Sequence, residues 1–292
     1  MAAEDIEIPA DEMTNFCNFM RENRIGNTVA QSHRAIERYE QQHGIITAEQ
    51  LRENFSQILA ECVQIETEIF NEIVDNIRRE WMGDLLEHAN RRIGFPNFSN
   101  IAQQAIDILN RDQPIEHNLI DVVAILQRPN DGVSFSMRQS AKTRAGAAFQ
   151  NFLEHFFNTL NFDYERQQSL RPGEILDLVF PSLTVLQNAQ ETAMIMECQT
   201  TLKDRFRLSL GKTNDLNRQS TKLIATLSGM NLITQSDHND ITQAKISEIH
   251  DNNWRLVCLR QVAEELVNNN QDTIISFEDF VNNEYPRISQ RW

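Results

Sequence analysis

The first half of the chain carries a hydrophobic pattern that is typical of helices. From Leu51 to Ile73 apolar residues recur at spacings of three and four, and the sequence TAEQ, beginning at Thr47, offers a capping box at the start of this stretch. The pattern predicts a long amphipathic helix running toward Trp81, within a region from 10 to 125 that is helical almost throughout. Its apolar stripe suits a helix packed in a bundle, and its rhythm also suits a coiled-coil seam between two copies of the chain.

Turn-forming residues interrupt this pattern at three places. Glycine or proline breaks the helical periodicity at Gly83, at 94–96 and at 128–132. The last of these, Arg-Pro-Asn-Asp-Gly, is the best candidate for a domain boundary. We therefore predict a helical N-terminal region at 1–131 and a core domain at 132–292.

Beyond this boundary the periodicity changes to a mixture of helix and strand. Ala145–Leu160 predicts a helix with phenylalanines on one face, and short apolar runs predict strands at 175–180, 194–198, 223–227 and 255–259. Helical or mixed segments separate these strands, an alternation that is typical of an α/β core. The expected fold class is therefore α/β (α+β), with a helical N-terminal region added to the core.

Composition and charge narrow the possible roles. The chain of 292 residues has a net charge of −15, which weakens non-specific attraction to nucleic acid. Basic residues are nevertheless concentrated between Lys203 and Lys222, where six of them stand against two acidic residues. The four cysteines are scattered and form no CxxC pair, so we expect buried free thiols rather than a zinc site. The apolar runs are too short to cross a bilayer and the acidic N-terminus does not resemble a signal peptide, so we expect a cytoplasmic protein with no membrane partner.

Acidic residues stand inside two of the predicted strands. Asp177 interrupts one apolar run, and Glu197 and Gln199 lie at the end of the next. Because an unpaired charge buried in a strand is costly, two such carboxylates indicate a ligand that uses them. With the cations that follow, they suggest a Mg²⁺ site beside a phosphate, in which Asp177, Glu197 and the backbone carbonyl of Cys198 would be the metal ligands. The plainer alternatives are strand-end acids paired with arginine, and a solvated helix start at Lys203.

Such a site suits the hydrolysis of a phosphodiester. The reaction needs a nucleophilic water, stabilisation of the charge that develops on the phosphate, and a protonated leaving group. A metal held by carboxylates supplies the first two, and a nearby cation would orient the water and neutralise charge. The residues therefore predict a magnesium-dependent nuclease that acts on DNA.

Three segments of the second half carry a more specific resemblance. KTRAGAAFQNFLEHFF at 142–157, ILDLVFPS at 175–182 and QTTLKDRFR at 199–207 are similar to three parts of the PD-(D/E)xK restriction endonucleases: the leading helix, the metal-binding hairpin and the strand-to-recognition-helix junction. The resemblance is closest to the EcoRII catalytic domain and its SsoII and PspGI relatives, and it covers about 142–227. It implies a central mixed β-sheet flanked by helices, and a type II restriction enzyme that hydrolyses double-stranded DNA with Mg²⁺.

The resemblance also implies how DNA is read. In this family an acidic–Arg dipeptide at the position of Asp204 and Arg205 reads C·G pairs, because the Arg donates to guanine and the carboxylate accepts from cytosine. We therefore expect a short palindromic target of the CCGG or CCNGG type, with further DNA contacts from Lys203, Arg207 and Arg144. A two-fold symmetric target calls for a homodimer, and the helical N-terminal region would form its interface, contact flanking DNA, or both. A restriction enzyme also implies a cognate DNA methyltransferase.

The chain departs from the family pattern at the catalytic positions. Gln199 stands where the family has its catalytic Lys, Gln150 where the leading helix often carries Glu, and Leu176 where the PD pair has Pro. Lys212 stands thirteen residues after Gln199, where the relatives keep a metal-binding Glu, while Glu197 places an acid on the strand. We interpret this as a swap that keeps two carboxylates and a lysine, with Lys203 as the other candidate for the missing cation. The predicted catalytic set is Asp177, Glu197, Gln199 and Lys212.

Other functions stay open at this point. Gln199 could mark a site without a cation, in which the metal alone activates water. A non-catalytic or differently specific DNA-binding protein of the same fold fits the glutamine substitutions and the acidic surface. A repair or mismatch nuclease of the same superfamily would differ in not requiring a strictly palindromic target. A helical scaffold would explain residues 10–125 but leaves the strand carboxylates unexplained.

Overall fold

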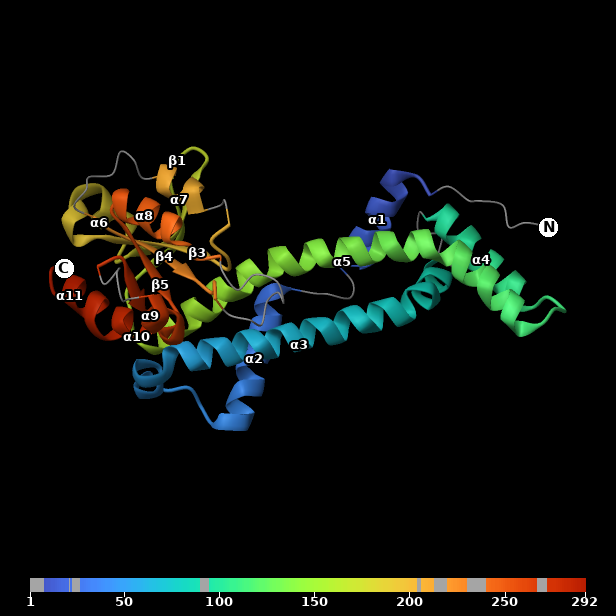
Figure 1. Cartoon of the computed structure of the whole chain (residues 1–292), viewed down its shortest axis with the longest axis horizontal. Helices are drawn as coiled ribbons and strands as arrows, with labels where there is room; N and C mark the ends of the chain where they lie inside the picture. Colours follow the sequence, from blue (N-terminus) through green and yellow to red (C-terminus); the bar gives the residue numbers. More distant parts are fainter. Residues whose placement is uncertain are drawn as a thin grey trace. The chain divides into compact units, whose positions relative to one another are not determined.

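The chain folds into two compact units, each made of two segments. The computed structural model describes residues 8–20, 22, 27–89, 95–203, 206–212, 220–229, 240–266 and 272–292, and within these ranges it leaves out the side chains at 78, 81–89, 128, 142 and 212. Unit 1 comprises Met1–Gln31 and Thr67–Arg144, and unit 2 comprises Ser32–Glu66 and Ala145–Trp292. The two longest helices, α3 (Ala48–Ala89) and α5 (Ile115–Thr159), each contribute residues to both units (Figure 1).

The elements described in unit 1 are all helices, which confirms the helical prediction for the N-terminal part of the chain. The core is enclosed by α1 (Ala10–Met20), the later part of α3, α4 (Pro96–Leu109) and the earlier part of α5. Within it, the rings of Phe16 and Phe98 stack with centroids 4.1 Å apart. The buried Glu12 carboxylate accepts hydrogen bonds from the backbone N–H groups of Asn97 at 2.8 Å and Phe98 at 3.2 Å. It thus satisfies donors that the first turn of α4 leaves open.

The helix breaks predicted at Gly83 and at 128–132 are wrong. Helix α3 continues past the first to Ala89, and α5 runs through the second. Pro129 lies inside α5, where its missing N–H removes one helical hydrogen bond, and packing against α1 supports the helix around it. Gly132 allows that packing, because a Cβ there would lie 2.5 Å from the Sδ atom of Met13. The boundary expected at 131 therefore lies inside a continuous helix, and the roles assigned to the two regions stay predictions.

Unit 2 is built on a mixed sheet, which confirms the predicted fold class. Its strands neighbour one another in chain order, with β1, β2 and β3 antiparallel and β3 to β6 parallel. Strands β2 to β5 coincide, within a residue or two, with the four predicted apolar runs. The sequence of β1, ERQQSLR, is polar because β1 is an edge strand with mostly exposed side chains, so its apolar pattern is too weak to predict it. The strands are β1 (Glu165–Arg171), β2 (Glu174–Phe180), β3 (Met194–Gln199), β4 (Thr221–Thr226), β5 (Trp254–Cys258) and β6 (Ile274–Ser276).

The remaining helices of the described chain are short apart from α2. No helix in the described part of the chain combines the length and the apolar character needed to cross a membrane. These helices are α2 (Thr28–His43), α6 (Leu183–Asn188), η2 (Gln190–Thr192), α7 (Phe206–Lys212), α8 (Gln243–Asp251), α9 (Arg260–Leu266), α10 (Phe277–Asp279), η4 (Phe280–Glu284) and α11 (Tyr285–Ser289).

Helices cover both faces of the sheet in unit 2. On one face, α7, α8 and α9 pack into a core that includes Ile195 of β3. On the other, rings from α3, α5 and α10 meet: Phe55 stacks on Phe277 with centroids 5.1 Å apart and meets the edge of Phe156 at 5.3 Å. Because side chains alternate along a strand, Glu197 lies on the same face as Ile195, toward α7. The position of the predicted site follows from this alternation.

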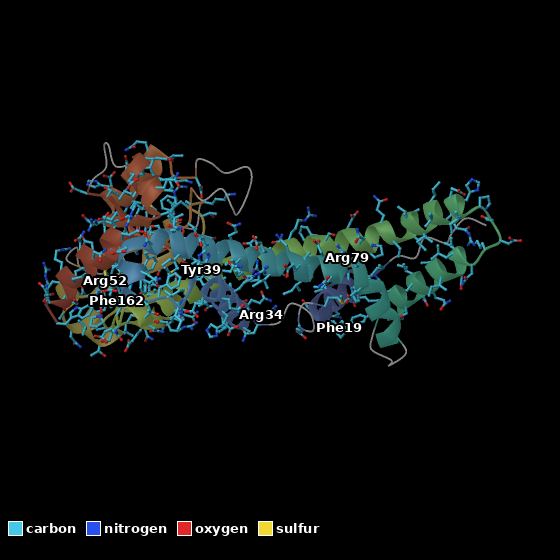
Figure 2. The ribbon with its side chains drawn as sticks, turned by 90° about the horizontal axis from the view of Figure 1, so that it is seen from below. Phe19, Arg34, Tyr39, Arg52, Arg79 and Phe162 are labelled. Carbon is cyan, nitrogen blue, oxygen red and sulfur yellow. The ribbon has the colours of Figure 1, made fainter. Side chains whose placement is uncertain are left out.

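Helix α3 bends within unit 2, and polar groups from the C-terminal elements support the bend. The backbone of Asn54 leaves the helical conformation, with φ −133° and ψ 30°. The N–H and Oγ of Ser56 donate to the buried carboxylate of Glu278 at 2.8 and 2.7 Å, which caps the helix where it resumes. On the other side of the bend, Arg52 donates to the carbonyl of Val281 at 3.3 Å, and Figure 2 shows Arg52 beside the C-terminal helices.

Glu278→Ala should lower the free energy of unfolding by about 2 kcal/mol, because it removes the acceptor of two buried donors of Ser56. It also removes the ion-pair partner of Arg260 at 3.5 Å. Chemical denaturation measures the effect. The control Glu264→Ala removes an exposed carboxylate from α9 and should change stability by less than about 0.5 kcal/mol. Equal effects of the two substitutions would contradict the capping role.

Candidate active site

Asp177 lies where strands β2 and β3 separate. The antiparallel register pairs Leu178 with Met196, and one further step would place Asp177 opposite Glu197. At this step the half-buried carboxylate of Asp177 accepts the backbone N–H of Cys198 at 2.8 Å. The side chain thus takes the place of a ladder carbonyl. The side chain of Asp177 is thereby held against the end of β3.

Glu197 and Gln199 are joined through a residue of α7. The hydroxyl of Ser209 lies 3.1 Å from Oε2 of Glu197, and Nε2 of Gln199 donates to the same hydroxyl at 2.7 Å. Glu197 and Ser209 are both buried, with 2% of each exposed, whereas Gln199 is half-buried. Phe206 and Leu210 fix α7 against the sheet, which brings the hydroxyl between the two strand residues. Sequence reasoning missed Ser209, which has no distinguishing local pattern.

The charges of three carboxylates act on the thiol of Cys198. Burial raises the pKa of this thiol well above its usual range, and the negative charges of Asp177, Glu197 and Glu154 raise it further. The thiol is therefore protonated at neutral pH. The contribution of Glu154 shows that a carboxylate of α5 acts on the Cys198 thiol.

Glu154 is the second residue that sequence reasoning missed. It lies one turn after Gln150 on α5, and Nη1 of Arg166 on β1 pairs with its Oε2 at 2.9 Å. Burial raises its pKa, against the opposing effect of Arg166. The signal that points to it is its spacing of four residues from Gln150, which places both on one helix face. The chain therefore keeps an acid on this helix, one turn beyond the position expected from the family pattern.

Lysines and arginines predicted to serve the site are only partly described. Lys203 is exposed just after β3, whereas Asp204 and Arg205 lie outside the described residues. Lys212 ends α7, and its side chain also lies outside the description. Its position is three residues after Ser209, and residues at that spacing share a helix face.

Two other residues predicted to contact DNA interact with side chains of the protein itself. The guanidinium of Arg207 is exposed and forms a bidentate pair with Glu248 of α8, with distances of 2.9 and 3.1 Å. In unit 1 Arg144 is buried, and its guanidinium carbon lies 3.7 Å from the centroid of the Phe70 ring. Burial lowers the pKa of Arg144 to about 10. A DNA contact from Arg144 would require this stack to open, whereas the guanidinium of Arg207 is already exposed.

The segment between β3 and α7 is anchored to the segment after β4. The backbone N–H of Leu202 donates to the hydroxyl of Ser228 at 2.8 Å. That hydroxyl donates to Asp240 at 3.4 Å, and the other oxygen of Asp240 pairs with Lys245 at 2.7 Å. These contacts fix the backbone up to the residue that precedes the predicted DNA-reading segment.

The ligands available at the ends of β2 and β3 suit a hard cation. Among the described residues, no three His, Cys, Asp or Glu side chains group closely enough to hold a metal ion by themselves. Mg²⁺, however, is commonly bound by one or two carboxylates, with waters and substrate phosphates supplying the other oxygens. The carboxylates of Asp177 and Glu197 and the carbonyl of Cys198 offer oxygen ligands that fit that kind of site.

Comparisons with known proteins show the family and the fold of the chain. The model of a protein family described as EcoRII C terminal matches residues 130–281, which is more than half of the chain. A structure of metal-depleted Ecl18kI in complex with uncleaved DNA has a TM-score of 0.74 and 17% sequence identity, covering 98% of this chain and 86% of that one. A complex of the restriction endonuclease PspGI with substrate DNA has a TM-score of 0.63 and 13% identity, covering 94% of this chain and 96% of that one. At these identities the structures establish a common fold. No curated protein sequence matches the chain.

Proposed function

The chain belongs to the EcoRII C-terminal family, and from this we propose that it is a type II restriction endonuclease. It would hydrolyse phosphodiester bonds in double-stranded DNA with Mg²⁺, at a short palindromic site of the CCGG or CCNGG type. The observation that supports the proposal is the hydrogen bond from the backbone of Cys198 to Asp177 at the point where β2 and β3 separate, next to Glu197 on β3. Carboxylate oxygens at strand ends are ligands that Mg²⁺ takes in proteins.

Each residue of the site has a distinct proposed task. Asp177 and Glu197, with the carbonyl of Cys198, would hold Mg²⁺. When bound, the metal would polarise the phosphoryl group and lower the pKa of a bound water. Lys212, on the helix that carries Ser209, would neutralise charge that develops on the phosphate.

Specificity is assigned to the segment that follows β3. Asp204 and Arg205 would read C·G pairs in the major groove, and the Ser228 anchor supports this by fixing the backbone just before them. Lys203 and Arg207 would contact phosphates. A palindromic target supports a homodimer as the working form. The function further implies a cognate methyltransferase that protects host DNA, and a cytoplasmic location.

One observation favours a second candidate, a non-catalytic DNA-binding protein of the same family. Gln199 takes the place of the catalytic lysine and is hydrogen-bonded to Ser209, so no cation is supplied from that strand position. This candidate predicts DNA binding that is indifferent to Mg²⁺, and no cleavage.

The two candidates are separated by incubating the purified protein with a plasmid of known sequence, with Mg²⁺ and with EDTA. The endonuclease should give discrete fragments only with Mg²⁺, because phosphate polarisation depends on the metal. Their ends should map to one short palindrome containing CC and GG. A matched plasmid with that palindrome mutated is the control and should stay intact. An uncut plasmid under all conditions would favour the binding protein.

A further inference from the structure

The hydrogen bonds around Ser209 fix the orientation of the Gln199 amide. The carboxylate of Glu197 accepts a hydrogen bond from Ser209, and a serine hydroxyl has a single hydrogen to donate. The bond of 3.1 Å from Ser209 to Glu197 uses that hydrogen. Ser209 must therefore accept the bond of 2.7 Å from Gln199, so the NH₂ group of Gln199 faces Ser209. In most amide side chains the two ends are hard to tell apart, but here the carboxylate determines which end is which.

The other end of the amide is a buried acceptor. With its NH₂ group turned to Ser209, the Gln199 side chain turns Oε1 away from it. This oxygen is buried, and it has no hydrogen-bond partner within the described residues. Leaving a buried acceptor unsatisfied costs free energy, so the arrangement favours a donor that binds there. Gln199 stands at the end of β3, two residues after Glu197, and a water that attacks a phosphate held at Asp177 and Glu197 is such a donor.

We propose that Gln199 Oε1 accepts a hydrogen bond from the attacking water, and that Ser209 is a positioning residue that holds the amide in this orientation. The inference rests on the proposed nuclease function. The water oxygen forms the new bond to phosphorus while the bond from phosphorus to the leaving deoxyribose oxygen breaks. The proton lost by the water passes to solvent, and a proton from solvent joins the leaving oxygen. Gln199 changes neither charge nor protonation, because an amide orients a water but is not a base.

A double-mutant cycle tests this assignment. Gln199→Met keeps the length of the side chain and removes the acceptor, and Ser209→Ala removes the hydroxyl that orients it. Each should lower the single-turnover cleavage rate at saturating DNA by about 10- to 100-fold, since each abolishes one oriented contact to the reacting water. The double variant should be no slower than Gln199→Met alone, because Ser209 acts through Gln199. Ser209→Thr, which keeps a hydroxyl, should restore most of the rate.

Two further readouts exclude a merely structural role for Ser209. The affinity for target DNA, measured with Ca²⁺ in place of Mg²⁺, should be unchanged in all variants, and the rate should keep its dependence on pH because neither side chain titrates. Ser220→Ala, which removes a similarly buried hydroxyl at the start of β4, should cleave like the wild type.

The outcomes separate this inference from the proposed function. A wild-type protein that does not cleave would overturn both. If the wild type cleaves and Gln199→Met cleaves equally fast, only the assignment of the water falls. If the effects of the two substitutions multiply in the double variant, Ser209 acts through Glu197 instead, and its positioning role toward Gln199 is wrong. If Ser209→Ala does not fold, Gln199→Met and Ser209→Thr still decide the matter.

Discussion

Asp177→Asn should reduce the rate of DNA cleavage by at least about 1,000-fold, because it removes one of the two carboxylates proposed to hold Mg²⁺. The amide keeps an oxygen that can accept the backbone N–H of Cys198, which now lies 2.8 Å from the carboxylate. The separation of β2 and β3 should therefore be preserved. The substitution changes the charge of the site and leaves its framework intact.

Single-turnover cleavage of a short target duplex measures this effect, and affinity for the same duplex in Ca²⁺ serves as the test of correct folding. Asp163→Asn is the matched control, since it makes the same chemical change at an exposed position of unit 2 and should cleave like the wild type. Cleavage by Asp177→Asn at more than about a tenth of the wild-type rate would show that Asp177 is not a metal ligand.

Lys212→Ala should lower the cleavage rate by about 100-fold or more, with little change in DNA affinity. If the acid and the lysine have exchanged places, Lys212 is the cation that neutralises charge on the phosphate, and its loss removes an interaction made mainly in the transition state. Lys203→Ala, the competing position for the missing lysine, should have a smaller effect on the rate because Lys203 lies exposed beyond β3.

The exchange itself is tested by moving the cation back to the strand. In a Lys212→Ala background, Gln199→Lys should recover part of the lost rate, because it restores a lysine at the position where the family pattern has one. Both variants are assayed by single-turnover cleavage. Full cleavage by Lys212→Ala alone would rule out the exchange, and a large loss in Lys203→Ala would assign the role to Lys203.

The sequence predicts this fold well wherever the buried apolar residues follow a regular pattern along the chain. The strands that carry Asp177 and Glu197 are buried apolar runs, so both their positions and their interrupting acids are visible in the sequence. The breaks expected at Gly83 and Gly132 fail because the helices continue through them, and at Gly132 the small residue serves the packing of Met13. Local helix propensity does not reveal a packing contact of this kind, because the contact involves a distant part of the chain.

The parts of the site that sequence reasoning missed lie on helices. Ser209 reaches Glu197, and Glu154 acts on the Cys198 thiol, only because α7 and α5 are packed against the sheet at particular rotations. Each looks like an ordinary polar position on an amphipathic helix. Predicting them requires the contact between elements, whereas Asp177 and Glu197 stand out within their own strands.

The part of the chain that the family model matches differs from the part that folds as unit 2, because α3 and α5 are each divided between the two units. The family model matches residues 130–281, yet unit 2 also needs Ser32–Glu66. This earlier segment supplies Phe55 to the aromatic core and Ser56 to Glu278. A fragment cut at the start of the matched region would expose the rings of Phe156 and Phe277 and leave a buried carboxylate without its donors. Exchange of whole catalytic modules between relatives would therefore succeed only if the earlier segment were inherited with them.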